Sequence, residues 1–196
     1  MMIPGVELRF ISPGVGHGVC STRPIPRGTI VWVLDPLDRR IPESEYASLP
    51  ELLRSEVDMY GYLDADGDRI LCWDLGRFMN HSCDPTGRNV GGLFEIATCD
   101  IPVGAELTTD YAFLNVGLPS ACACGSSRCR GEISLAGGDL AAHARVWDHE
   151  AAAAVALAGG VEQPLESLLE LHPALAGLRA RLRHRPRHSS AELRAT

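Results

Sequence analysis

The sequence predicts a mainly β fold with α-helical additions, built from several small sheets and followed by C-terminal helices. Short β-like runs separated by glycine and proline turns fill much of residues 6–111. Residues 139–182 are instead rich in alanine and leucine at helical spacing. Three cysteines lie close together between these two parts, which in a reducing compartment favours a metal site over disulfides.

The length of 196 residues suits one domain with an appendage, or two small units. No apolar run approaches the roughly 18 residues that would suggest a membrane span. Residues 1–7 lack the basic and apolar regions of a signal peptide. We therefore expect a cytoplasmic protein without membrane contact, and nucleoid association or export as an effector remain open alternatives.

Charge is unevenly distributed along the chain, and all 18 basic residues are arginines. Residues 1–178 carry 12 Arg against 24 acidic residues, whereas residues 179–196 carry six Arg against one Glu. An acidic body argues against wrapping nucleic acid and favours a basic partner, although solubility alone explains it equally well. Direct nucleic-acid binding is expected at most through the Arg-rich tail. The arginine-only, alanine-rich composition fits a GC-rich and hence bacterial genome.

The first strands are expected at residues 6–11, 19–22 and 29–34. The loop between the first two brings three glycines into five residues at Gly14, Gly16 and Gly18, which permits either a hairpin turn or close approach of a ligand. Residues 24–28 form a turn whose Ile-Pro-x-Gly pattern recurs at residues 101–104, before another strand at 105–109.

The middle region, residues 37–75, has a different character. Residues 44–59 have helical spacing, with Pro50 starting a new helix at its first turn. Strands at 60–63 and 70–73 flank an acidic segment, residues 64–68. This segment resembles a calcium loop, but its glycine comes too early, at the fourth position instead of the sixth, and its twelfth position is Leu75 instead of Glu. A hairpin turn built on Asp-Gly is therefore expected.

The stretch from Arg77 to Pro85 combines a cation, large apolar groups, an amide, an imidazole and a thiol. A plain core strand would not need so many polar groups, since each needs a partner if buried. Cys122, Cys124 and Cys129 follow C-x-C-x4-C spacing, which leaves a tetrahedral zinc one ligand short. Cys83 is the natural fourth ligand, with His81 and His143 as alternatives. The remaining cysteines are expected to be small buried hydrophobes; they are Cys20, Cys72 and Cys99.

Residues 139–158 predict a helix that Gly159 and Gly160 would end. Residues 165–182 form a second amphipathic segment, and residues 183–196 are expected to be a disordered basic tail.

Taken together, these pieces resemble the SET domain, the protein-lysine methyltransferase family, from about Leu8 to Gly131. The resemblance rests on residues 16–18, 77–85, 104–111 and the clustered cysteines. It implies several small sheets with a knot-like crossing between the Asn-His segment and the strand that ends at the Tyr. The implied divisions are a SET domain at 1–117 with an insert at about 37–75, a post-SET zinc segment at 118–134, a helical appendage at 135–182 and the tail at 183–196.

The resemblance also implies site residues. S-adenosyl-L-methionine would bind at Gly16, His17, Gly18, Asn80, His81 and Tyr111. The lysine would enter from the opposite face, past the catalytic Tyr111 and Tyr60, with Tyr62 as the alternative to Tyr60. Structural zinc would be held by Cys83, Cys122, Cys124 and Cys129.

The implied activity is methyl transfer to a lysine side chain of a basic protein, such as a histone, a histone-like protein or a ribosomal protein. The alternative is a catalytically silent, zinc-stapled interaction module with the same fold. The presence of Asn80, His81 and Tyr111 favours the enzyme. The chain departs from the family at Thr109, where many members carry an aromatic residue. We also expect Arg77 and Glu106 to form a buried pair.

Overall fold

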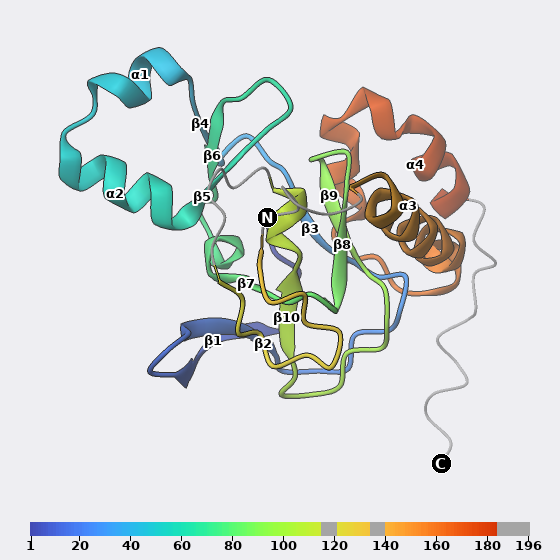
Figure 1. Cartoon of the computed structure of the whole chain (residues 1–196). Helices are drawn as coiled ribbons and strands as arrows, with labels where there is room; N and C mark the ends of the chain where they lie inside the picture. The colour runs from blue at the N-terminus through green and yellow to red at the C-terminus, as the bar shows by residue number, and fades with distance from the viewer. Residues whose placement is uncertain (115–120, 134–139, 184–196) are drawn as a thin grey trace.

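The computed structural model describes residues 1–114, 121–133 and 140–183. Three small β-sheets form most of the body, and helices lie at two opposite ends of it (Figure 1). The predicted mainly β class with helical additions is confirmed. The expected domain limits near residues 117 and 134 fall at segments outside the described residues, as do residues 184–196 of the predicted tail. Arg183, where that tail was expected to begin, is instead the last residue of a helix.

The first sheet has the strand order β1-β2-β10-β7. Its strands are β1 (Val6–Ser12), β2 (Gly16–Ser21), β10 (Glu106–Thr109) and β7 (Asn80–His81). β7 runs parallel to β10, with Asn80 beside Thr108 and His81 beside Thr109. This pairing brings the Asn-His motif to the end of the strand that precedes Tyr111, as the resemblance implied.

The second sheet has the order β3-β9-β8 and holds much of the hydrophobic core. β3 (Ile30–Val33) was expected, but β8 (Gly87–Val90) and β9 (Phe94–Ala97) were missed. Their hairpin turns through Gly91 and Gly92, both of which have positive φ. Each strand has only four residues and is interrupted by an Arg or a Glu, so its alternation of apolar and polar residues is too short to predict a strand.

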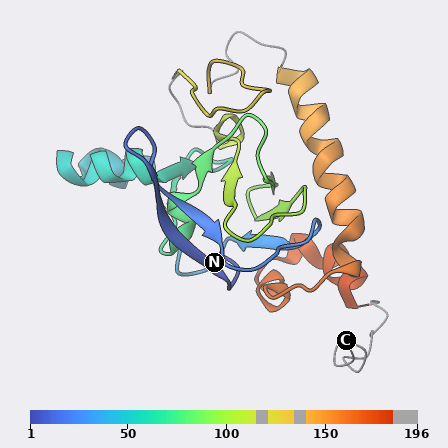
Figure 2. The ribbon, with the colours of Figure 1, turned by 90° about the horizontal axis from the view of Figure 1, so that it is seen from below.

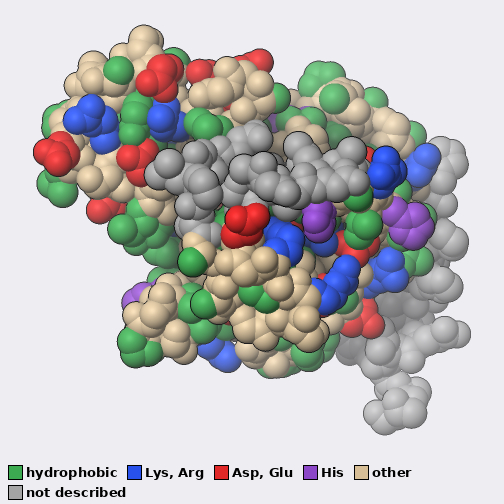
Figure 3. All heavy atoms as spheres, in the orientation of Figure 1, with side chains coloured by type: hydrophobic (Ala, Val, Ile, Leu, Met, Phe, Trp, Pro, Cys, Tyr) green, Lys and Arg blue, Asp and Glu red, His purple; other side chains and the backbone are tan. Residues whose placement is uncertain are grey.

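The third sheet belongs to an arm that projects from the body (Figure 1). It has the order β4-β6-β5, and its members are β4 (Arg39–Ile41), β6 (Arg69–Leu71) and β5 (Gly61–Leu63). Helices α1 (Glu43–Ser48) and α2 (Glu51–Tyr60) complete the arm. Acidic and basic side chains lie side by side on its surface (Figure 3).

The predicted hairpin turn at residues 64–68 is confirmed, since β5 pairs with β6 on either side of it. Gly67 has a φ of 85°, a conformation that favours glycine. Arg40 forms ion pairs with Asp64, Asp66 and Asp68, so an arginine offsets the acidic cluster. Pro50 stands at the N-cap of α2, one position before the predicted one.

The C-terminal helices lie on the opposite side of the body from the arm (Figures 1 and 2). α3 (Leu140–Leu157) matches the predicted alanine-rich helix and ends in a 3₁₀ turn, η3 (Ala158–Gly160). The amphipathic segment 165–182 is not one helix. It divides into η4 (Glu166–Leu171), η5 (Pro173–Leu175) and α4 (Ala176–Arg183), because Pro173 cannot continue a helix.

These helices share the core of the second sheet through Leu165, Leu169 and Leu182. Buried Gln163 strengthens the contact. It accepts a hydrogen bond from the Ile30 N–H at 2.9 Å and donates to the carbonyls of Gly28 at 2.7 Å and Ala158 at 3.0 Å. The C-terminal region thus satisfies backbone groups at the start of β3.

Two of the three single cysteines, Cys20 and Cys72, are buried as expected. The third expectation is wrong: Cys99 is exposed, because it follows β9 at the edge of a turn. None of the helices in the described residues is long and apolar enough to cross a membrane.

Candidate active site

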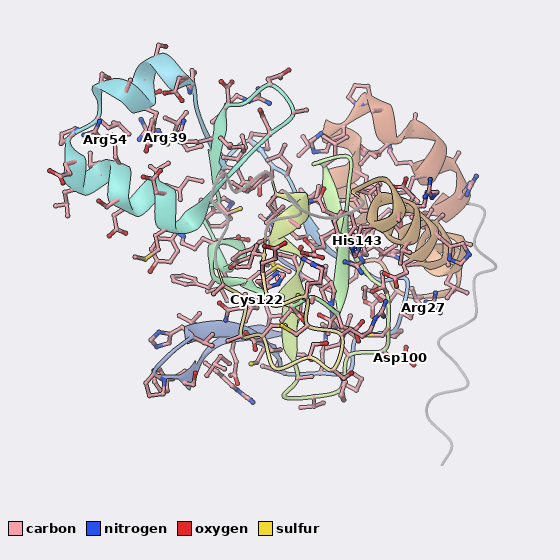
Figure 4. All side chains as sticks on the ribbon, viewed as in Figure 1. Arg27, Arg39, Arg54, Asp100, Cys122 and His143 are labelled. Atoms are coloured by element: carbon pink, nitrogen blue, oxygen red, sulfur yellow. The ribbon has the colours of Figure 1, made fainter. Side chains whose placement is uncertain are left out.

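Cysteines from two distant parts of the chain meet beside the first sheet. The ligand atoms of His81, Cys83, Cys122 and Cys124 all lie within 4.8 Å of one another. The Sγ atoms of Cys83 and Cys122 are 3.7 Å apart. Figure 4 shows Cys122 near the centre of the molecule, well away from Arg39 and Arg54 on the arm.

Backbone N–H groups point at three of the sulfurs. The Cys83 N–H donates to Cys124 Sγ at 3.5 Å, the Arg130 N–H donates to Cys83 Sγ at 3.4 Å, and the Gly131 N–H donates to Cys129 Sγ at 3.4 Å. Burial alone would raise the pKa of the Cys124 thiol, but the N–H donors of Cys83 and Ser126, with the neighbouring thiols, lower it to about 6. Such donors stabilise thiolates, the form in which cysteine binds metal.

The sulfur geometry fits zinc. Zinc–sulfur bonds of about 2.3 Å in a tetrahedron place the sulfurs about 3.8 Å apart, close to the separation of Cys83 and Cys122. Cys129 Sγ is not in the group of ligand atoms described above and lies 3.6 Å from the Cys122 carbonyl oxygen. His81 Nε2 is in that group and lies 3.3 Å from Cys83 Sγ, so Cys129 and His81 are the two candidates for one position. His143 instead lies on α3 against Trp147.

A buried carboxylate joins the cysteine segment to the first sheet. Asp110 is 2% exposed and accepts two hydrogen bonds of 2.8 Å from the Arg130 guanidinium. Arg88 of β8 approaches the same carboxylate at 3.6 Å, and His81 Nδ1 also lies 3.6 Å away. Because Asp110 directly precedes Tyr111, the cysteine segment and the end of β10 are held by one ionic cluster.

Five of the six residues assigned to the methyl donor lie on β2 and β7, and the sixth is Tyr111. The Asn80 side-chain amide donates to the His17 carbonyl at 3.0 Å and to Glu106 Oε1 at 2.6 Å. Gly18 lies against both groups, and a Cβ at this position would collide with the Glu106 carboxylate and lie 2.8 Å from Asn80 Nδ2. At Gly16, by contrast, nothing lies within 4 Å of an added Cβ.

The expected pair between Arg77 and Glu106 is wrong. The Glu106 carboxylate accepts a hydrogen bond from the Asn80 side-chain amide, whereas the Arg77 guanidinium donates to the Trp73 carbonyl at 2.8 Å. The His81 ring is also turned toward the thiols. Its Nδ1 accepts the Tyr111 N–H at 3.2 Å, and its Nε2 faces Cys83. Burial and the Arg130 charge lower the pKa of His81, while Asp110 opposes them.

Tyr111 stands in η2 (Tyr111–Phe113), directly after β10. Its hydroxyl donates a 2.8 Å hydrogen bond to the carbonyl of Met79, the residue before β7. Burial, with a contribution from Glu106, raises the pKa of Tyr111 to about 12, so the hydroxyl keeps its proton at neutral pH. Tyrosine and carbonyl thus lie at the junction of the two parallel strands.

A narrow pocket of about 80 Å³ opens beside this junction. Its aromatic and apolar lining includes Trp32, Tyr60, Tyr62, Met79 and Tyr111. Tyr60, at the end of α2, packs edge-on against Phe78 of η1 (Leu75–Phe78), with ring centroids 5.3 Å apart. Both tyrosines considered from the sequence, Tyr60 and Tyr62, therefore face the same space as Tyr111.

Sequence reasoning missed one charged residue of this pocket. Glu95 of β9 lines it together with Thr109, and the Glu95 side chain is 4% exposed. The available signal was a lone acidic residue between Phe94 and Ile96, in a segment apolar enough to be buried.

Residues 16–112 match the SET domain family. Histone-lysine N-methyltransferase ASHH2 from Arabidopsis thaliana is 31% identical in an alignment 149 residues long that covers 67% of this chain and 8% of that protein. Histone-lysine N-methyltransferase SETD2 from Homo sapiens is 31% identical in an alignment 131 residues long that covers 60% of this chain and 5% of that protein. The chain thus corresponds to a small part of these relatives.

Among solved structures, KRYPTONITE in complex with mCHG DNA and SAH aligns with 24% identity and a TM-score of 0.47. The alignment covers 65% of this chain and 28% of that one. The matching residues contain β2, the Asn80-His81 strand and the strand that leads to Tyr111, and they include every residue that lines the pocket except Leu114. The chain therefore belongs to the SET-domain family.

Proposed function

We propose that this protein is an S-adenosylmethionine-dependent protein-lysine methyltransferase. One observation carries the proposal: the Tyr111 hydroxyl is fixed on the Met79 carbonyl at the wall of a narrow aromatic pocket, where β7 and β10 run in parallel. On β7 itself, Asn80 lies against the Gly18 backbone of β2. A pocket for the methyl donor and a channel for the lysine can therefore meet at Tyr111.

The chain's own residues would position both reactants. The backbone of residues 16–18, the Asn80 amide, His81 and Tyr111 would hold S-adenosylmethionine, which when bound supplies an electrophilic methyl group. Trp32, Tyr60 and Tyr62 would surround the lysine side chain. A lysine amine is mostly charged at neutral pH, and apolar walls favour the neutral form that can attack. Tyr111 and the Met79 carbonyl would align the amine with the methyl group.

The substrate we propose is a lysine-bearing basic protein, such as a histone, a histone-like protein or a ribosomal protein. The acidic balance of residues 1–178 would attract it. Relatives named histone-lysine N-methyltransferases support the same class.

We assign zinc a structural role at Cys83, Cys122, Cys124 and Cys129. Zinc would tie the cysteine segment to the end of β7, and it has no part in the chemistry. Elemental analysis of Cys129→Ser and His81→Ala separates the two possible ligand sets. We expect Cys129→Ser to lose bound zinc and His81→Ala to keep it. The reverse result would make His81 the fourth ligand.

The decisive test measures transfer of labelled methyl from S-adenosylmethionine to core histones and to a bacterial lysate enriched in basic proteins. We expect a labelled protein band that fades by about 10²-fold or more in Tyr111→Phe. Tyr46→Phe is the matched control, because Tyr46 lies on the arm and is the tyrosine that does not line the pocket. Cofactor binding without transfer to any substrate would favour the silent interaction module. Failure to bind cofactor would exclude the methyltransferase.

A further inference from the structure

Three residues that line the Tyr111 pocket each have a buried polar atom without a hydrogen-bond partner in the described part of the chain. Trp32 Nε1, Tyr62 Oη and Glu95 Oε1 all lack a hydrogen bond within the described residues, and all three residues line this pocket. Buried polar atoms are nearly always satisfied, so each exception needs an explanation. Their convergence on one pocket indicates a polar ligand that supplies the missing partners.

Glu95 is held in place as part of the pocket wall. It pairs with Asn89 on β8 and with Trp32 across a bulge in β3. The Thr109 side chain hydrogen-bonds the carboxylate from β10. Gly87 leaves room for it, since a Cβ there would lie 2.8 Å from Glu95 Oε1. One carboxylate oxygen nevertheless stays without a partner.

Two other carboxylates, one in the Tyr111 pocket and one beside Asn80, already accept hydrogen bonds. Asp58 lines the same pocket, but its oxygens accept the Tyr46 hydroxyl at 2.7 and 2.9 Å. Glu106 accepts the Asn80 amide at 2.6 Å. Glu95 is therefore the carboxylate in this pocket best placed to receive a charged ligand.

The charges around Glu95 do not neutralise it fully. Arg88 is the nearby cation, but its guanidinium is shared with Glu150, at 2.7 Å, and with Asp110, at 3.6 Å. Burial therefore raises the pKa of Glu95 to about 7, although Thr109 and Arg88 oppose the change. A carboxyl group with such a pKa exchanges protons readily at neutral pH.

The remaining titratable groups that line the pocket come from four other segments: Tyr60 and Tyr62 around the start of β5, Cys72 after β6, Arg77 in η1, and Tyr111 after β10. Burial raises the pKa values of Tyr62, Cys72 and Tyr111, so these three stay neutral at physiological pH. Arg77 remains charged but donates to the Trp73 carbonyl.

We propose that Glu95 binds the ammonium group of the substrate lysine and accepts its proton before methyl transfer. This inference rests on the methyltransferase function proposed above. The unpaired oxygen of Glu95 would receive one N–H of the ammonium group, and the Tyr62 hydroxyl would contact the same nitrogen. Thr109 takes the place where many family members carry an aromatic side chain, and it gives this end of the pocket a polar wall.

The step balances in protons and electrons. One ammonium N–H bond breaks, its proton moves to the Glu95 carboxylate, and the electron pair stays on nitrogen. That pair then forms the new nitrogen–carbon bond while the sulfur–carbon bond breaks and its electrons remain on sulfur. Glu95 releases the proton to solvent when the product leaves.

Carboxyl-carbon NMR of protein labelled with [5-¹³C]glutamate tests the ammonium site without a known substrate. Glu95→Gln assigns the Glu95 signal and Glu150→Gln the Glu150 signal, each in protein saturated with S-adenosylhomocysteine. We expect n-butylammonium to lower the titration midpoint of Glu95 by about one pH unit and to leave that of Glu150 unchanged. A Glu95 titration curve that n-butylammonium does not move would overturn the proposal.

Kinetics on histones or another labelled substrate test the proton transfer. We expect Glu95→Gln to lower kcat by about 10²-fold, with cofactor affinity unchanged by calorimetry. The acid limb of the wild-type pH profile should lie near pH 7 and move upward in the variant. Glu162→Gln removes an exposed carboxylate that does not line the pocket and should keep both activity and profile.

The two proposals fail in different ways. Equal rates and pH profiles for wild type and Glu95→Gln would overturn the role of Glu95 and keep the methyltransferase. Wild-type protein that binds no cofactor would overturn the methyltransferase, and the n-butylammonium titration would still decide whether Glu95 receives an ammonium group.

Discussion

The cysteine cluster and the Tyr111 pocket both include residues of the paired strands β7 and β10, yet their polar groups are arranged differently. In the cluster, backbone N–H groups of Cys83, Arg130 and Gly131 all point at sulfurs, and Asp110 binds Arg130 through both oxygens. Among the described residues, the groups there that lack a hydrogen bond are arginine nitrogens beside the Asp110 charge, Arg130 Nε and Arg88 Nη1. In the pocket, an indole N–H, a hydroxyl and a carboxylate oxygen are buried without partners.

This difference in hydrogen bonding suggests that the cluster stabilises the fold and that the pocket is built for a ligand. A satisfied polar network stabilises the folded state, whereas each unpaired buried group costs stability. Substitutions in the cluster should therefore destabilise the protein. Conservative substitutions in the pocket should stabilise it while impairing ligand binding or turnover, as is common where a site is built for a ligand.

The largest effect is expected from Cys83→Ser. Structural zinc contributes about 10–16 kcal/mol to the folding of small metal-binding units. We expect the loss of the Cys83 ligand to remove about a third of such a contribution, which lowers the free energy of unfolding by about 3–5 kcal/mol. Thermal denaturation and elemental analysis should show a lower melting temperature together with lost zinc, and a chelator should reproduce the effect on wild type. Cys99→Ser is the control, because this thiol is exposed and outside the cluster. Equal stability and zinc content in both variants would contradict the comparison.

Asp110→Asn should destabilise the protein by about 3–5 kcal/mol, because it leaves the Arg130 guanidinium partly buried without its counter-charge. Denaturant unfolding measures this change. Asp100→Asn provides a matched control. Asp100 is exposed and accepts only the Arg27 N–H at 2.8 Å, at a corner far from Cys122 (Figure 4), so its loss should cost about 1 kcal/mol or less. Equal losses in the two variants would show that the ionic cluster adds no special stability.

Glu95→Gln should act in the opposite direction and depend on pH. The folded-state pKa of about 7 lies above the ordinary value of 4.5, so the folded protein binds the proton more tightly. This contribution is fully present below pH 4.5 and is lost as the pH rises through 7, a change of about 3 kcal/mol. Denaturant unfolding at pH 4 and pH 8 should therefore show the variant stabilised relative to wild type only at pH 8. A stability difference that does not change with pH would refute the assignment.

The smallest effect is expected from Tyr62→Phe. Removing a buried hydroxyl that has no partner should stabilise the free protein by about 1 kcal/mol. The same variant should bind n-butylammonium more weakly. Thermal denaturation with and without the amine measures both effects, and Tyr46→Phe, which loses a hydrogen bond to Asp58, should not be stabilised. A destabilised Tyr62→Phe would mean that the hydroxyl has a structural partner.

The two regions also differ in how well the sequence predicts them. Cys122, Cys124 and Cys129 are neighbours in the chain, and their spacing alone predicts a metal site, with Cys83 as the expected fourth ligand. Asn80 and Tyr111 followed from the family resemblance. What the sequence could not decide is the choice between Cys129 and His81, since it depends on the direction in which the imidazole ring turns.

The pocket depends on residues from many separate segments, and local patterns contain little information about it. Glu95 lies on a strand too short for a period to be recognised, and its partner Thr109 drew attention only as a departure from the family. The predicted pair of Arg77 and Glu106 failed for a related reason. Charge and neighbouring strands suggested it, but the Asn80 amide competes for the same carboxylate.

Gln163 bears on how the chain can be shortened. A fragment that stopped after the cysteine segment would keep every residue of the family match, yet it would strip the partner from the Ile30 N–H and the Gly28 carbonyl and uncover the Ile30 side of the core. The smallest self-sufficient piece of this protein therefore extends through Leu182. We expect a fragment that ends after the cysteine segment to aggregate, so its inactivity would not test the proposed methyl transfer.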